Sequence, residues 1–178
     1  CYEDIELKTP RSVPDTKGQP AVIGIDYADV RDFASAGVLT EKDGCYIFKQ
    51  HTWICRQSPF FESIKFPLQH YGQLEFSDFT IVDEPTIPIS QMIDWCEQRM
   101  CEYDVKKITM DTYRYTLFKT MFEERGISIE SRDNPGGLVR LIRKLGSAMT
   151  VVAPVIEEAF SNGKIIYGPS AIMRWYTN

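Results

Sequence analysis

The sequence predicts an α/β domain, built on a mixed β-sheet with helices on its faces. Three apolar segments between residues 21 and 54 follow one another closely, which is typical of an antiparallel meander of three strands. After residue 88, helical patterns alternate with short apolar strands, which indicates a sheet extended by parallel strands. The length of 178 residues, of which 43% are hydrophobic, suits a single domain with a sizeable core.

The first half of the chain begins with an expected linker. Residues 1–20 are rich in Pro, Lys and Asp, and they predict an irregular segment that ends at Pro20. Residues 56–84 hold scattered aromatic side chains without a clear period, so we expect an ordered loop region with one short helix. The strands of the meander are expected between these segments, in residues 21–28, 32–44 and 45–54.

The second half reads as alternating helices and strands. Apolar residues recur at helical spacing in 88–104, where Ser90 is the expected cap, and Gly126 is expected to end the helix that follows Asp111. The segment 138–145 fits a strand or a helix equally well. The expected helices are 88–104, 112–126, 147–163 and 171–178, and the expected strands are 105–111, 127–131 and 164–168.

Composition excludes several classes of protein. Twenty Lys and Arg against twenty-five Asp and Glu, with a pI near 5.1, do not fit a protein that bulk charge holds on nucleic acid. Contact with a polyanion would have to be local or assisted by a metal ion. The five cysteines form no C-x-x-C pair, so we expect reduced thiols and no structural metal site. No apolar stretch approaches the roughly 20 residues of a membrane span.

Two aspartates, Asp26 in "VIGID" and Asp111 in "ITMD", each stand at the end of a short apolar strand. If the two strands are neighbours, the carboxylates lie side by side and repel each other. A divalent cation removes that repulsion, and hard Mg²⁺ or Mn²⁺ prefers oxygen ligands. A pair of such cations activates water and stabilises the leaving oxygen of a phosphodiester, which is the chemistry of a nuclease.

Other readings of these acids remain open. Each aspartate alone also fits a helix cap or a turn residue at the end of a strand. The "GID" segment resembles the start of a phosphate loop, but the following "YADVRD" lacks the Gly and Ser/Thr that such a loop needs. We therefore do not expect a nucleotide site.

Several longer segments resemble the nuclease domain of the large terminase subunits of tailed bacteriophages, the HK97-like terminase family. "GIDYADVRDFA", with Gly24, Asp26, Asp32 and Ala34, and the following hairpin "GVLTEKDGCYIFKQHTWI" match its first strands. "ITMDTYRYTLFKTMFEERG" resembles its second acidic strand and the helix after it. "VAPVIEEAFSNGKIIYGPSAIMRWYTN" resembles its late helix, short strand and Trp-Asn signature, so the similarity runs from about residue 20 to the last residue.

The resemblance implies a ribonuclease H-like fold and a metal-dependent endonuclease that cuts concatemeric double-stranded DNA during viral genome packaging. Asp26 and Asp111 are then the catalytic residues and ligands of two divalent cations, Mg²⁺ or Mn²⁺, and Asp32 is a candidate further ligand. Residues 1–20 are expected to be the linker from an N-terminal ATPase domain. Residues 21–178 are expected to be a nuclease domain without its C-terminal end, because the family carries a third acid on a later helix. For that reason we expect this chain to cleave DNA weakly or not at all.

The resemblance also implies partners and a location. The partners are double-stranded DNA, the terminase ATPase domain, the small terminase subunit and the portal protein, in the cytoplasm of a bacterial host of a phage or prophage. Two alternatives remain: a non-catalytic module that docks DNA or the portal, and a ribonuclease H-like resolvase or transposase. A surface that contacts DNA phosphates is expected from basic residues of the second half: Arg132, Arg140, Arg143, Lys144, Lys164 and Arg174.

Three further groups of residues are expected to have ordinary roles. His51 and His70 are expected to be plain polar side chains, because a water activated by metal needs no histidine. The tryptophans Trp53, Trp95 and Trp175 are expected in the core or at an interface. Glu157 and Glu158 are expected to be exposed, on a helix whose apolar side is Val151, Val152, Val155, Ile156, Ala159 and Phe160.

Overall fold

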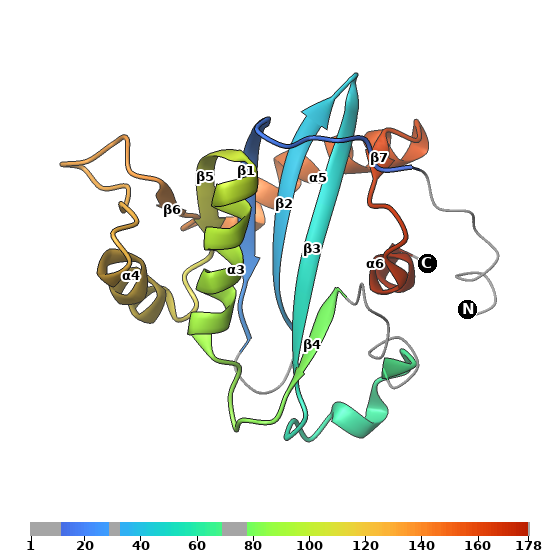
Figure 1. Cartoon of the computed structure of the whole chain (residues 1–178), viewed down its shortest axis with the longest axis horizontal. Coiled ribbons are helices and arrows are strands. Elements are labelled where there is room, and N and C mark those ends of the chain that lie inside the picture. Colours follow the sequence, from blue (N-terminus) through green and yellow to red (C-terminus); the bar gives the residue numbers. More distant parts are fainter. Residues whose placement is uncertain (1–11, 29–32, 69–77, 178) are drawn as a thin grey trace.

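A seven-stranded mixed sheet forms the centre of the computed structural model, which describes residues 12–28, 33–68 and 78–177 (Figure 1). The strands are β1 Pro20–Asp26, β2 Ala34–Lys42, β3 Cys45–Cys55, β4 Phe79–Val82, β5 Asp104–Met110, β6 Val139–Leu141 and β7 Ile165–Ile166. The helices are the 3-10 helix η1 Phe61–Ser63 and the α-helices α3 Ile89–Glu102, α4 Tyr115–Glu124, α5 Leu145–Ser161 and α6 Ala171–Thr177.

The order of the strands across the sheet is β4-β3-β2-β1-β5-β6, and β7 pairs with β3 outside this path. Strands β1, β2 and β3 form the expected antiparallel meander, and β5 and β6 continue the sheet from β1 as parallel strands. Strands β4 and β7 run parallel to β3 on its other side. The predicted fold class, an α/β ribonuclease H-like domain with a mixed sheet and flanking helices, is confirmed.

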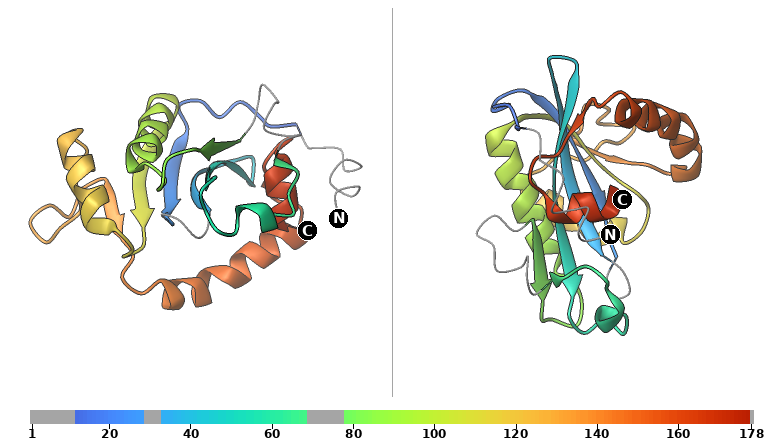
Figure 2. Two further views of the ribbon diagram at one scale, coloured as in Figure 1. Left: turned by 90° about the horizontal axis from the view of Figure 1, so that it is seen from below. Right: turned by 90° about the vertical axis from the view of Figure 1, so that its right-hand side faces the viewer.

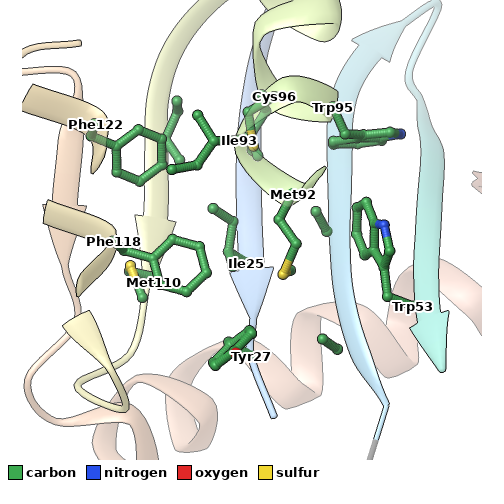
Figure 3. Packing of buried hydrophobic residues seen from close by; sticks show 14 of the residues in the cluster. Ile25, Tyr27, Trp53, Met92, Ile93, Trp95, Cys96, Met110, Phe118 and Phe122 are labelled. Atoms are coloured by element: carbon green, nitrogen blue, oxygen red, sulfur yellow. The ribbon is translucent and has the colours of Figure 1, made fainter. Parts of the chain in front are cut away.

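Alternation along β1 explains which face of the sheet is buried. Ala21, Ile23 and Ile25 are 6% exposed or less, whereas Val22 and Gly24 between them are exposed. The buried side packs against Met92, Ile93 and Cys96 of α3 and against Phe118 and Phe122 of α4 (Figure 3). Helix α5 crosses the opposite side of the sheet (Figure 2). The core therefore lies between the meander and the α3–α4 layer.

A second hydrophobic cluster attaches α6 to the β3–β4 side of the molecule. It contains Ile54, Phe66, Phe79 and Ile172, with Trp175 packed against Phe66 at 5.7 Å between ring centroids. The half-buried carboxyl of Asp78 accepts hydrogen bonds from Ser170, just before α6, and from Gln50. Burial raises the pKa of Asp78, and these hydrogen bonds oppose the rise. The network fixes the start of α6 against the sheet.

The structure corrects four expectations about elements. Strand β4 lies in the segment expected to be loop and one short helix, and its four residues become a strand through pairing with β3. Residues 127–131 form only an isolated bridge, between Ile129 and Val139. Ser90 is not a cap, because α3 begins at Ile89 after Pro88 without a side-chain cap. The apolar side of α5 is largely exposed, and Ala159 is its buried residue.

Other expectations are confirmed. Gly126, at φ 73°, follows the end of α4, and its N–H donates to the carbonyl oxygen of Glu123 at 3.0 Å. The segment 138–145 contains a strand, β6. Trp53 and Trp95 are buried, and Glu157 and Glu158 are exposed. Among the described residues, no helix has the length and apolar character required to span a membrane.

Candidate metal site at the carboxyl edge of the sheet

The parallel pairing of β1 with β5 brings the two aspartates to neighbouring backbone positions. Ile23 is the partner of Ile108, and Ile25 is the partner of Met110. The next residue of each strand is Asp26 and Asp111. Because neighbouring strands in a sheet lie about 4.8 Å apart, the backbones of the two aspartates lie side by side at the carboxyl edge of the sheet. Asp26 is exposed and Asp111 is half-buried.

The turn after β5 orients the carboxylate of Asp111. Its Oδ1 accepts a hydrogen bond of 2.9 Å from the backbone N–H of Tyr113, which is the geometry of an Asx turn. Arg114 then adopts the left-handed conformation at φ 54°, and α4 begins at the next residue. A carboxylate offers about four lone-pair positions. The hydrogen bond therefore fixes Asp111 and leaves capacity for a cation.

The end of β1 is held by the residue after Asp26. Tyr27 is 7% exposed, and its hydroxyl donates to the carbonyl oxygen of Ile87 at 2.8 Å. The centroids of its ring and of the Phe118 ring lie 5.2 Å apart, with an angle of 73° between the planes (Figure 3). Because side chains alternate along a strand, Asp26 points to the opposite face, on which Val22 and Gly24 also lie.

Small polar groups surround Asp26 on that face. Ser35 of β2 is its antiparallel partner, and Thr109 of β5 is the partner of Gly24. The hydroxyl of Thr109 donates to the carbonyl oxygen of Ile23 at 3.1 Å, so it is held against the sheet.

Two neighbouring carboxylates fit one hard divalent cation, whose remaining positions are filled by water or phosphate oxygens. Within the described ranges there is no group of three or more His, Cys, Asp or Glu residues that could hold a metal ion. Asp32, the candidate further ligand, lies outside the described residues, as does His70. A second cation, as expected from the sequence, stays a prediction.

The basic residues expected to contact DNA do not gather at one place. Leu141 of β6 is the partner of Met110, so Arg143 and Lys144 follow at the same edge as Asp111, and both are exposed. Arg132 is exposed in the loop before β6.

Three of the expected DNA contacts need correction or qualification. Arg174 is only 7% exposed in α6, which does not fit the expected surface contact. Lys164 precedes β7 at the amino end of β3, which is the opposite edge of the sheet. Arg140 is exposed but bonds to Glu130 at 3.0 Å, and with Lys107 it lowers the pKa of that carboxyl.

The sequence patterns did not single out two residues near Asp111, Tyr113 and Arg114. Arg114 is exposed, and its guanidinium lies 5.5 Å from the centroid of the Tyr113 ring. The Tyr113 ring lies 6.2 Å from that of Tyr27. Their position in the strand–turn–helix segment directly after Asp111 was the available signal, because such turns carry functional residues at the carboxyl ends of strands.

His51 lies on β3, two strands from β1, and its partner on β2 is Ala36, which pairs in turn with Ile25. Its Nε2 is 2.8 Å from the hydroxyl oxygen of Thr80, and burial, aided by the charge of Arg99, lowers its pKa to about 4. A neutral, hydrogen-bonded imidazole agrees with the expected role as a plain polar side chain.

No protein-family model matches the sequence, and no curated protein matches it. The structure is similar to the crystal structure of the HK97 bacteriophage large terminase, with a TM-score of 0.70 and 13% sequence identity. The similarity covers 94% of this chain and 33% of that chain, so this chain spans about a third of the length of that terminase. At this identity the likeness shows a shared fold.

Proposed function

We propose that this chain is a terminase-like nuclease domain, which cuts double-stranded DNA with a divalent cation held between Asp26 and Asp111. The observation that carries the proposal is the parallel register of β1 and β5, whose last pair, Ile25 and Met110, is followed by an aspartate on both sides. The fold shared with the HK97 large terminase over 94% of the chain supports the same function.

In this function, the residues at the carboxyl edge of the sheet have two roles, to bind the cation and to hold the DNA. Asp26 and Asp111 bind the cation, and the N–H of Tyr113 keeps the Asp111 carboxylate in one orientation. A cation held there would supply activation of a water molecule and stabilisation of the leaving oxygen of the phosphodiester. Arg143 and Lys144 hold the phosphates of the DNA backbone. Because contacts to phosphates carry no base information, little sequence preference is expected.

The wider role belongs to the same proposal. A chain that spans a third of a large terminase would act beside an ATPase domain, with the small subunit and the portal protein, during packaging of concatemeric DNA in a bacterial cytoplasm. Asp32 is a further ligand in this proposal, and a pair of Mg²⁺ or Mn²⁺ ions is the expected cofactor.

Nicking of supercoiled plasmid in Mn²⁺, with and without EDTA, tests the proposal. We expect slow nicking that EDTA abolishes, and a loss of at least about tenfold in Asp26→Asn and in Asp111→Asn. Asp43→Asn is the matched control, because Asp43 lies in the β2–β3 turn at the other end of the sheet, where its φ of 53° also suits Asn. This control is expected to keep full activity.

Other outcomes would favour other functions. Equal nicking by all variants would contradict the proposal. DNA binding without nicking, unchanged in both aspartate variants, would favour the docking module. A strong preference for branched DNA over plasmid would favour a resolvase.

A further inference from the structure

A pair of tyrosine rings connects the two turns that carry the aspartates. Tyr27 directly follows Asp26, and Tyr113 is the second residue after Asp111. Their ring centroids lie 6.2 Å apart with an angle of 27° between the planes, which is an offset stack. Strand pairing between β1 and β5 ends just before the aspartates, so this stack continues the connection beyond the last paired residues.

The Tyr27 ring is a fixed support for this stack. It is buried, its hydroxyl is bonded to the carbonyl oxygen of Ile87, and it packs edge-on against Phe118. Tyr113 is different, because 44% of it is exposed. An aromatic ring at that exposure is not needed to fill the core. Its ring takes part in the stack with Tyr27, and the Arg114 guanidinium lies near the same ring.

Tyr113 also supplies the N–H that orients Asp111. The ring and the N–H belong to one residue, so a ring held on Tyr27 also holds the 2.9 Å bond from the N–H to Oδ1. Two like-charged carboxylates repel when no cation lies between them. Without the stack, the turn after β5 would have one restraint fewer against movement of Asp111 away from Asp26, and a larger separation would weaken their shared binding of one cation.

We propose that Tyr113 is a positioning residue, which sets the affinity for a divalent cation by stacking on Tyr27 and so holding Asp111 beside Asp26. This inference rests on the proposed function. Residues that orient metal ligands typically contribute about 10- to 100-fold in affinity. The Tyr113 hydroxyl has no part in this role, so the aromatic ring is the required feature.

Calorimetric titration of the metal-free chain with Mn²⁺ tests this role. Tyr113→Ala is expected to weaken Mn²⁺ binding about tenfold, and Tyr113→Phe is expected to bind as the unmodified chain does. Leu117→Ala is the matched control, because Leu117 is 51% exposed on α4 and lies one turn beyond Tyr113. That control is expected to leave the affinity unchanged.

The outcomes separate this inference from the function on which it rests. If the unmodified chain binds Mn²⁺ no better than a chain with both Asp26→Asn and Asp111→Asn, the proposed function fails. If it binds better and Tyr113→Ala binds equally well, the inference is overturned and the function stands. Circular dichroism and a thermal melt check folding. If Tyr113→Ala does not fold, Tyr113→Leu replaces it, and unchanged affinity in that variant also overturns the inference.

Discussion

His51 shows how burial of a single side chain makes stability depend on pH. Its pKa is lowered from 6.5 to about 4, first by burial and then by the charge of Arg99, so the folded chain favours the neutral ring. The stabilisation is fully present above pH 6.5, and it is lost as the pH falls towards 4. The whole effect amounts to about 3 kcal/mol in the free energy of unfolding.

His51→Gln is expected to remove this pH dependence. Glutamine stays neutral and can still bond to Thr80, which is 2.8 Å from the imidazole nitrogen in the present structure. Urea unfolding at several pH values between 7 and 4 measures the effect. We expect the stability of the unmodified chain to fall more steeply than that of the variant. Parallel curves for the two chains would show that His51 does not carry the dependence.

The two aspartates were predictable as separate candidates, from single residues and their neighbours in the sequence. Each acid follows an apolar run, and that pattern is visible without a structure. The burial of Arg174 was not predictable, because the sequence does not reveal which charged side chains tertiary packing covers. The sequence also does not reveal that Arg140, in β6, bonds to Glu130, which lies ten positions earlier in the chain.

At the scale of elements, the turn into β6 depends on one of two adjacent glycines. A Cβ on Gly137 would lie 2.2 Å from the carbonyl carbon of Ile129 and 2.3 Å from the nitrogen of Glu130. These are backbone atoms, so they cannot rotate away. Gly136 has open space at the same position. The carbonyl oxygen of Gly137 also accepts a hydrogen bond from the Lys107 ammonium at 2.6 Å, which ties the turn to β5.

Gly137→Ala is therefore expected to destabilise the chain by about 2–3 kcal/mol, as overpacking against rigid neighbours does. Gly136→Ala is the matched control, with a change expected within about 0.5 kcal/mol. Urea unfolding of both variants gives the two values. Equal stability of the two variants would mean that the turn opens easily, and that β6 is not fixed by this close approach.

The elements also show where sequence patterns stop being informative. Long periodic segments such as α3 and α4 were predicted, because their apolar side chains repeat at helical spacing. Strand β4 was missed, since four residues give no usable period and their strand form depends on pairing with β3. Helix α5 was predicted, yet Val151 is 72% exposed and Val155 53%, because periodicity indicates an apolar side and not what covers it.

At the scale of the whole molecule, the sheet topology is what brings distant residues together. Strand β5 enters the sheet beside β1 although eighty-five residues separate Asp26 from Asp111 in the sequence. The meander was predictable from its short turns, but the choice of β1 as the neighbour of β5 is a tertiary fact. That choice decides whether the aspartates are two unrelated strand ends or one site.

Anomalous diffraction from crystals grown or soaked in Mn²⁺ tests the central claim most directly, because it locates the cation and both carboxylates in one experiment. We predict an anomalous peak within about 2.5 Å of a carboxylate oxygen of Asp26 and of one of Asp111. The peak should disappear in crystals of Asp111→Asn. A peak elsewhere on the surface, or carboxylates more than about 10 Å apart with no peak between them, would contradict the account.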